Sequence, residues 1–190
     1  LAEAHDRITE RQSFQLDLSD RPRPLKTPAD IAAAASAMLG GKMRISRVTY
    51  VEVDDAAGTF VQRRWNSRGD PEAILEPRQL ADFGPEIIAT LRRAEPLVIR
   101  DVATDPRTMP HAGAYESIGV RSNLAIPLVK AGRLTIVLSL QHDQPRDWTL
   151  SDIDLATDVA ERTWSAAENA RAQEELAAGS RRKDEFLAML

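Results

Sequence analysis

The sequence contains no cysteine, and this absence excludes several kinds of chemistry. Without thiols the chain cannot form a disulfide, hold an iron–sulfur cluster, carry a cysteine-linked chromophore or use a thiolate nucleophile. Histidine is scarce as well. His5, His111 and His142 lie far apart in the sequence and have no metal-ligand spacing, so we expect no metal site.

Long apolar runs and a positive charge excess are also missing. No stretch approaches the roughly 18 apolar residues of a membrane span, and no signal peptide is present, so we expect a cytoplasmic protein. The net charge of −4 argues against nucleic-acid binding, which needs a basic face. The 43% of hydrophobic residues is typical of a folded globular domain. Because the chain opens with Leu1 instead of Met, we expect it to be a piece of a longer protein.

The stretch 123–142 predicts a central β-hairpin, with strands Asn123–Val129 and Leu134–Gln141 and a turn that uses Gly132. Side chains alternate along a strand, so the second strand has two different faces. One face is aliphatic and consists of Leu134, Ile136, Leu138 and Leu140. The other is mixed and consists of Thr135, Val137, Ser139 and Gln141. We expect helices on the aliphatic face and a partly polar cavity on the mixed face; a solvated mixed face is the alternative.

Proline, glycine and apolar periodicity predict the remaining elements. A helix over Leu1–Asp20 ends before Pro22 and Pro24. A second helix begins at Thr27 as the cap and is stopped by Gly40 and Gly41. The further expected elements are strands Met43–Val53, Thr59–Trp65 and Leu97–Val102, a loop over Asn66–Glu76, and short helices Glu86–Arg93 and Pro110–Ser117.

From Thr149 to Leu190 the pattern predicts one very long helix, capped by Thr149 and Asp152. Its second half repeats apolar positions that no single-domain core can cover, among them Leu176, Leu187 and Leu190. We therefore expect a homodimer that pairs through the terminal helices. Gly179 is a weak helix former within this segment and is a candidate point of signal-dependent change.

Together these elements predict an α/β (α+β) fold. We expect an antiparallel central sheet of about five strands, helices on both faces, and long N- and C-terminal helices.

Several stretches resemble bacterial GAF domains, the sensory modules related to PAS domains. The likeness lies in three stretches: VIRDVATDPR at 98–107, SNLAIPLVKAGRL at 122–134 and DWTLSDIDLATDVAERTWSAAENAR at 147–171. The last ten residues, RRKDEFLAML, resemble the opening of the dimerisation and phosphoacceptor helix of sensor histidine kinases. The resemblance implies a linker helix over 1–24, a GAF domain over 25–170 and a signalling helix over 171–190. It also implies a downstream kinase domain, which this fragment lacks, and a response regulator as partner.

The chain also departs from well-known GAF subfamilies. It has neither the NKFDE-type motif of cyclic-nucleotide binders nor the DIP motif and cysteine of many bilin binders. The cysteines of the methionine sulfoxide reductases of this family are missing too. The resemblance therefore implies a pocket without identifying a ligand. We leave the cofactor unknown and expect no covalent bilin.

The candidate ligand-binding residues lie near the cavity that the resemblance implies. They are Trp65, Phe83, Ile99, Asp101, Tyr115, Ser122, Asn123 and Ser139. For the aromatic residues the alternative is plain core packing, and for the polar residues it is turn formation and capping. Two functions stay open: a sensor of a small molecule, and a ligand-free structural relay and dimerisation module. No catalytic constellation occurs at usable spacing, so we expect no enzyme activity of the fragment itself.

Overall fold

The computed structural model describes residues 27–66, 73–74 and 76–188. The chain divides into two compact units, Ala35–Ser165 and a second unit that combines Leu1–Ala34 with Ala166–Leu190. The helix predicted over Leu1–Asp20 lies outside the described residues. The unit Ala35–Ser165 contains the described strands.

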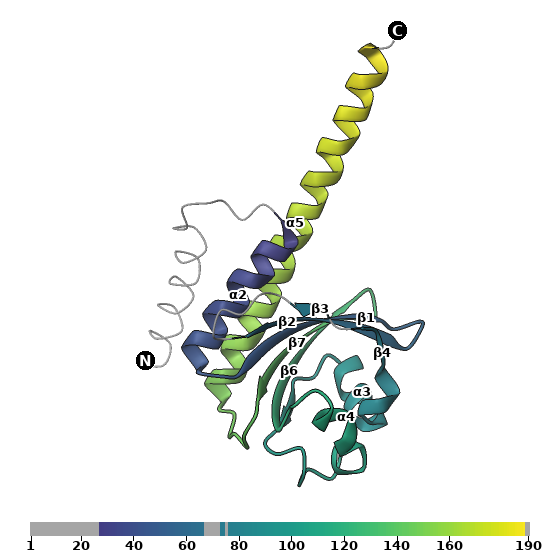
Figure 1. The fold of residues 1–190 in the computed structure, drawn as a ribbon. Coiled ribbons are helices and arrows are strands. Elements are labelled where there is room, and N and C mark those ends of the chain that lie inside the picture. The colour runs from purple at the N-terminus through teal and green to yellow at the C-terminus, as the bar shows by residue number, and fades with distance from the viewer. Residues whose placement is uncertain (1–26, 67–72, 75, 189–190) are drawn as a thin grey trace. The chain divides into compact units, whose positions relative to one another are not determined.

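An antiparallel sheet forms the centre of this unit (Figure 1). Among the described residues its strands have the order β3-β2-β1-β7-β6-β5, and β4 also pairs with β2. The bounds are β1 Arg47–Asp54, β2 Thr59–Asn66, β3 Ala73–Ile74, β4 Arg78–Gln79, β5 Leu97–Ile99, β6 Ser122–Lys130 and β7 Arg133–His142. The five predicted strands are confirmed. The two-residue strands β3 and β4 were not predicted, because such short pieces form only by pairing with β2.

Helices cover both faces of the sheet, as predicted (Figure 1). The 3₁₀ helices η1 (Leu80–Phe83) and η2 (Met109–His111) lie on one face with the short helices α3 (Pro85–Arg92) and α4 (Ala112–Glu116). Residues 35–43 of α2 (Pro28–Met43) and 150–165 of α5 (Leu150–Ala188) lie on the other. The sequence therefore predicted both the fold class and the two-sided covering.

The predicted hairpin is β6 and β7, which pair from Ser122 opposite His142 to Lys130 opposite Arg133. Its turn residues Ala131 (φ 50°) and Gly132 (φ 74°) both adopt the left-handed conformation that a two-residue type I′ turn requires.

One side chain of the hairpin departs from the predicted alternation. The register shifts between Leu128 and Val129, and Leu134 pairs with Val129. Beyond this bulge Leu134 packs in the hydrophobic cluster with Val137, a residue of the mixed face. The prediction that Leu134 shares a face with Ile136 was wrong, because a bulge inserts one residue and reverses the side-chain direction.

Reciprocal hydrogen bonds begin both long helices. The Asp30 amide donates to Thr27 Oγ1 (3.1 Å), and the Thr27 amide donates to the Asp30 carboxylate (3.3 Å). Thr149 and Asp152 make the same pair of bonds before α5, at 3.1 and 2.9 Å. Each pair satisfies two backbone groups that a helix start leaves unpaired, so both predicted caps are confirmed.

The helix α2 ends later than predicted. It continues through Gly40 and Gly41 to Met43, where burial of the Met43 side chain favours another turn. Arg44 then adopts a left-handed conformation (φ 50°), and the Ile45 amide donates back to the Gly40 carbonyl (3.3 Å). This is the hydrogen bond of a Schellman end. The glycine pair is therefore helix interior and not its stop.

The strand β5 ends at Ile99 instead of continuing to Val102. Beyond it, the Asp101 carbonyl accepts hydrogen bonds from the amides of Thr104 and Asp105, and its carboxylate accepts one from Ala103. Asp101 thus turns the chain away from the sheet, which is a common role of aspartate.

The helix α5 has 39 residues, and its uninterrupted course up to Ala188 confirms the predicted long helix within the described range. Leu190 and the side chain of Leu187 lie outside the described residues. Within the described part of the chain, none of the helices combines the length and apolar character that a membrane crossing demands.

Candidate ligand-binding site

A cavity of about 70 Å³ lies between the mixed face of the sheet and the short helices that cover it. A cavity needs at least about 10–15 Å³ to hold one water, so this space has room for a few waters or a very small organic molecule. Its described lining consists of Val51, Val53, Phe60, Gln62, Leu80, Phe83, Ile87, Ile88, Leu91, Leu97, Tyr115, Ile118, Val120, Asn123, Ala125, Val137, Ser139 and Gln141.

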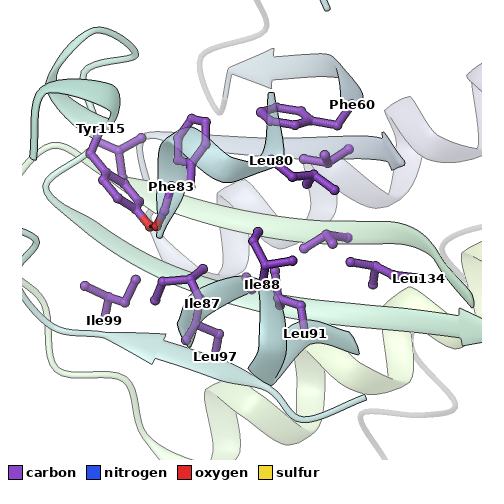
Figure 2. Packing of buried hydrophobic residues seen from close by; sticks show 14 of the residues in the cluster. Phe60, Leu80, Phe83, Ile87, Ile88, Leu91, Leu97, Ile99, Tyr115 and Leu134 are labelled. Atoms are coloured by element: carbon purple, nitrogen blue, oxygen red, sulfur yellow. The ribbon is translucent and has the colours of Figure 1, made fainter. Parts of the chain in front are cut away.

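Three aromatic rings form part of the wall (Figure 2). Phe83 packs edge-to-face against Phe60, with ring centroids 5.4 Å apart, and against Tyr115, at 5.1 Å. Edge-to-face pairs of this kind contribute about 0.5–1.5 kcal/mol beyond their buried area. The rings therefore hold η1, α4 and β2 together around the cavity.

The Tyr115 hydroxyl fixes this wall by donating a hydrogen bond to the Phe83 carbonyl oxygen (3.1 Å). Burial raises the pKa of Tyr115 far above its ordinary value, so the phenol stays protonated and remains a donor. Next to Phe83, Gly84 has φ 102°, and a Cβ there would lie 2.9 Å from His111 Cδ2. Only glycine allows this conformation and this approach of η1 to η2.

The other end of the cavity is polar. Ser139 Oγ donates a hydrogen bond to Asn123 Oδ1 (2.7 Å) and accepts one from Gln141 Nε2 (3.2 Å). These three residues and Gln62, which we call the polar group, are each less than 10% exposed: Gln62 6%, Asn123 9%, Ser139 4% and Gln141 4%. Buried amides and hydroxyls are normally fully hydrogen-bonded, so a polar group beside a cavity favours a ligand-binding role.

Charge is missing from the described lining, which contains neither an acidic nor a basic side chain. Nor does the described part of the chain gather three or more His, Asp or Glu side chains in a group suited to a metal ion. The lining therefore offers a bound molecule apolar contact and neutral hydrogen bonds.

The structure brings four of the predicted site residues together. Phe83, Tyr115, Asn123 and Ser139 all line the cavity. Ile99 is fully buried in the adjoining hydrophobic cluster and is not part of the lining. The side chain of Trp65 lies outside the described residues.

Asp101 and Ser122, also predicted as site residues, do not line the cavity. Asp101 accepts hydrogen bonds from Arg121 Nε (2.5 Å) and Arg121 Nη2 (3.1 Å). The Arg121 guanidinium lowers the pKa of Asp101 below its ordinary value. Ser122 precedes Asn123 on β6 and so points to the opposite face, where its hydroxyl donates to the Ile99 carbonyl (2.9 Å) and accepts from Trp148 Nε1 (2.9 Å).

Gln62 and Gln141 also line the cavity, although they are not among the residues predicted from the sequence. The sequence pattern could have predicted Gln141 as a lining residue, because it shares the mixed face of β7 with Ser139. The signal for Gln62 was weaker: it is two residues from Phe60 and therefore on the same face of β2. Only strand pairing, with Gln62 opposite Val51, brings it to the cavity.

The opposite face of the same strands contacts the first part of α5. Lys130 at the end of β6 pairs with Glu161 (3.1 Å) and lies 6.0 Å from the centre of the Trp164 ring. On β1 the buried Tyr50 side chain contacts the Thr163 side chain of α5, and burial raises the pKa of Tyr50. The strands that line the cavity therefore also contact residues 161–164 of α5.

The family model for the GAF domain matches residues 27–167, about three quarters of the chain. The chain belongs to the GAF domain family. The resemblance seen in the sequence is thereby confirmed at the level of the family. A comparison with curated proteins gave no match.

Several solved structures share the fold of this GAF domain. The GAF domain of Thermosynechococcus elongatus PixJ, in its blue-light absorbing form, has a TM-score of 0.62 at 20% identity, covering 82% of this chain and 93% of that one. The GAF domain of an Acinetobacter phosphoenolpyruvate-protein phosphotransferase has a TM-score of 0.59 at 14% identity, covering 88% and 95%. The Stigmatella aurantiaca phytochrome photosensory core module has a TM-score of 0.71 at 14% identity, covering 93% and 39%.

Proposed function

We propose that this GAF domain senses a small molecule in its cavity and relays the binding event through α5 to a histidine kinase core. The observation that carries the proposal is the placement of the cavity on strands that contact α5 from their other face. Val51 lines the cavity, and its neighbour Tyr50 meets Thr163 on α5. A ligand that shifts β1 therefore shifts a contact of α5.

The continuity of α5 supports the relay. The helix extends without interruption from Leu150, beside the sheet, to Ala188. It includes most of the segment RRKDEFLAML, whose likeness to the kinase dimerisation helix supports the kinase context. A ligand with unequal affinity for two arrangements of the helix shifts their populations by that difference in binding free energy.

Two of the three structures named above come from light-absorbing proteins. Light sensing through a cysteine-linked bilin is not the function we propose here, because the sequence has no cysteine. The small, uncharged lining supports a diffusible molecule of modest size instead.

The ligand-binding part of the proposal is tested by a protein-observed NMR screen of small molecules. Binders should shift the methyl signals of Val137, Ile88 and Leu91 in the cavity wall. Ala125→Leu fills the cavity and should abolish these shifts. Ala89→Leu adds the same atoms to the exposed side of α3 and should leave them unchanged. A screen without cavity binders would contradict ligand sensing and favour the alternative function, a ligand-free relay and dimerisation module.

The relay is tested separately by amide hydrogen exchange. With a cavity binder present, exchange should change in α5 around Thr163 and farther along the helix. A binder that alters exchange in the sheet alone, and leaves the whole of α5 unchanged, would contradict the relay while leaving ligand binding intact.

A further inference from the structure

The polar group has hydrogen-bonding capacity that its own members do not use. Ser139 satisfies the Asn123 oxygen and the Gln141 nitrogen. Among the described residues the Asn123 amide nitrogen, the Gln141 amide oxygen and both polar atoms of Gln62 have no side-chain hydrogen bond. None of them is a fully enclosed atom without a partner, and all three residues line the cavity, so these atoms are open to a hydrogen-bonding partner there. One unused donor and one unused acceptor therefore flank Ser139, and Gln62 offers one more of each.

A nearby cation does not change the neutral character of the cavity. Arg47 is opposite Gln141 in the ladder between β1 and β7. Its guanidinium donates a hydrogen bond to the Gly119 carbonyl, and Arg47 is not part of the lining. A charged ligand group would therefore leave water and meet no opposite charge among the described lining residues, which is strongly unfavourable.

We infer that the cavity selects an uncharged, largely apolar molecule with one neutral group that both donates and accepts hydrogen bonds, such as a primary amide, a urea or an alcohol. Such a group accepts from the Asn123 amide nitrogen and donates to the Gln141 amide oxygen, while its apolar part contacts the aromatic and aliphatic wall. This inference rests on the proposed ligand sensing and adds the chemical class of the ligand.

Three probes of nearly equal shape separate the effect of a hydrogen-bond donor on affinity from the effect of a negative charge. The probes share an isopropyl group on a carbonyl carbon and differ in the second substituent of that carbon. This substituent is an NH₂ group in isobutyramide, a methyl group in 3-methylbutan-2-one and a charged oxygen in isobutyrate. Their affinities are measured by NMR titration of the Val137 and Ile88 methyl signals at pH 7. Acetamide and acetate form a smaller pair for the same comparison.

The amides should bind at least tenfold more tightly than the matching carboxylates. Gln141→Met keeps the length of the side chain and removes its acceptor, so it should lower the ratio of amide to ketone affinity at least threefold. Gln79→Met, at an exposed position of β4, is the control and should leave this ratio unchanged. If Gln141→Met does not fold, the amide-to-carboxylate ratio in the unmodified domain still decides the question.

The outcomes distinguish this inference from the proposed function. Carboxylates that bind in the cavity as tightly as the amides would overturn the inference and leave ligand sensing standing. An amide-to-ketone ratio that Gln141→Met does not change would overturn the assigned hydrogen bond. Binding of none of these probes, together with a screen without cavity binders, would overturn both.

Discussion

Ser139 on β7 donates a hydrogen bond to Asn123 on β6, 16 positions earlier in the chain, and accepts one from Gln141 two positions later. One hydroxyl thus joins two amides at the polar end of an otherwise apolar cavity. A buried hydroxyl that both donates and accepts holds its neighbours in one arrangement, because each alternative leaves a polar atom unpaired.

Ser139→Ala removes the hydroxyl that makes both of these hydrogen bonds. The Asn123 oxygen and the Gln141 nitrogen then lose their partner, so we expect the free energy of unfolding to fall by about 1–3 kcal/mol. Urea denaturation followed by circular dichroism measures the change. Thr135→Ala, on the same strand but half-exposed, is the control and should cost less than about 0.5 kcal/mol. Equal effects of the two substitutions would contradict the role given to Ser139.

Tyr115→Phe tests the wall of the cavity. It keeps the ring against Phe83 and removes the hydroxyl that donates to the Phe83 carbonyl, so unfolding should become about 1 kcal/mol easier. Ser117→Ala removes an exposed hydroxyl that donates to the Ala114 carbonyl and accepts from Arg78 Nη1 (2.9 Å), and because both bonds are solvent-exposed it should change stability by less than about 0.5 kcal/mol. Denaturant titration compares the two, and a neutral Tyr115→Phe would contradict the prediction.

The pair Asp101 and Arg121 predicts a dependence of stability on pH. Arg121 lowers the folded-state pKa of Asp101, so the ionised carboxylate stabilises the fold at neutral pH. This contribution is lost as the pH falls from about 4, the range of an unfolded aspartate, through the lower folded-state pKa. Asp101→Asn should therefore destabilise the domain at pH 7 and have a smaller effect near pH 3. Thermal unfolding across this range measures it, with Asp154→Asn on the exposed side of α5 as control. An effect that does not shrink towards low pH would contradict the assignment.

The exposure of Leu176 leads to a prediction about assembly. Its side chain is 75% exposed in the single chain. If α5 pairs with a second copy, as the apolar positions of its second half predict, Leu176→Asp should raise the dimer dissociation constant at least tenfold, since a buried leucine contributes about 1.5–3 kcal/mol. Ala178→Asp, about 200° farther around the helix, is the control and should have a smaller effect. Light scattering at several concentrations measures both, and a monomer at all of them would contradict the homodimer.

Gly179 gives a prediction about the helix itself. A Cβ added at this position would have no neighbour within 4 Å, so Gly179→Ala changes helix propensity without a clash. We expect local stabilisation of about 0.5–1 kcal/mol, visible as slower amide exchange in the surrounding turns of α5. Ala178→Gly should have the opposite effect of similar size. Unchanged exchange in both variants would mean that propensity does not limit helix stability at this point.

The local features of this domain could be predicted from the sequence because they depend on neighbours in the chain. The caps Thr27 with Asp30 and Thr149 with Asp152 join residues three positions apart, and the turn at Gly132 depends on one backbone conformation. The buried positions of α3, Ile87, Ile88 and Leu91, follow from helical spacing. These patterns were sufficient for the five longer strands, the α-helices among the described residues and the fold class.

The tertiary structure alone decided which residues meet. Gly40 and Gly41 resemble a helix stop, yet burial of Met43 extends the helix by a turn. Asp101 and Ser122 have the chemistry of ligand-binding residues, but Arg121 and Trp148, distant in the sequence, engage them away from the cavity. Gln62 reaches the cavity only because β2 pairs with β1. Hydrogen-bond partners and side-chain burial depend on long-range packing, and local sequence patterns carry no record of it.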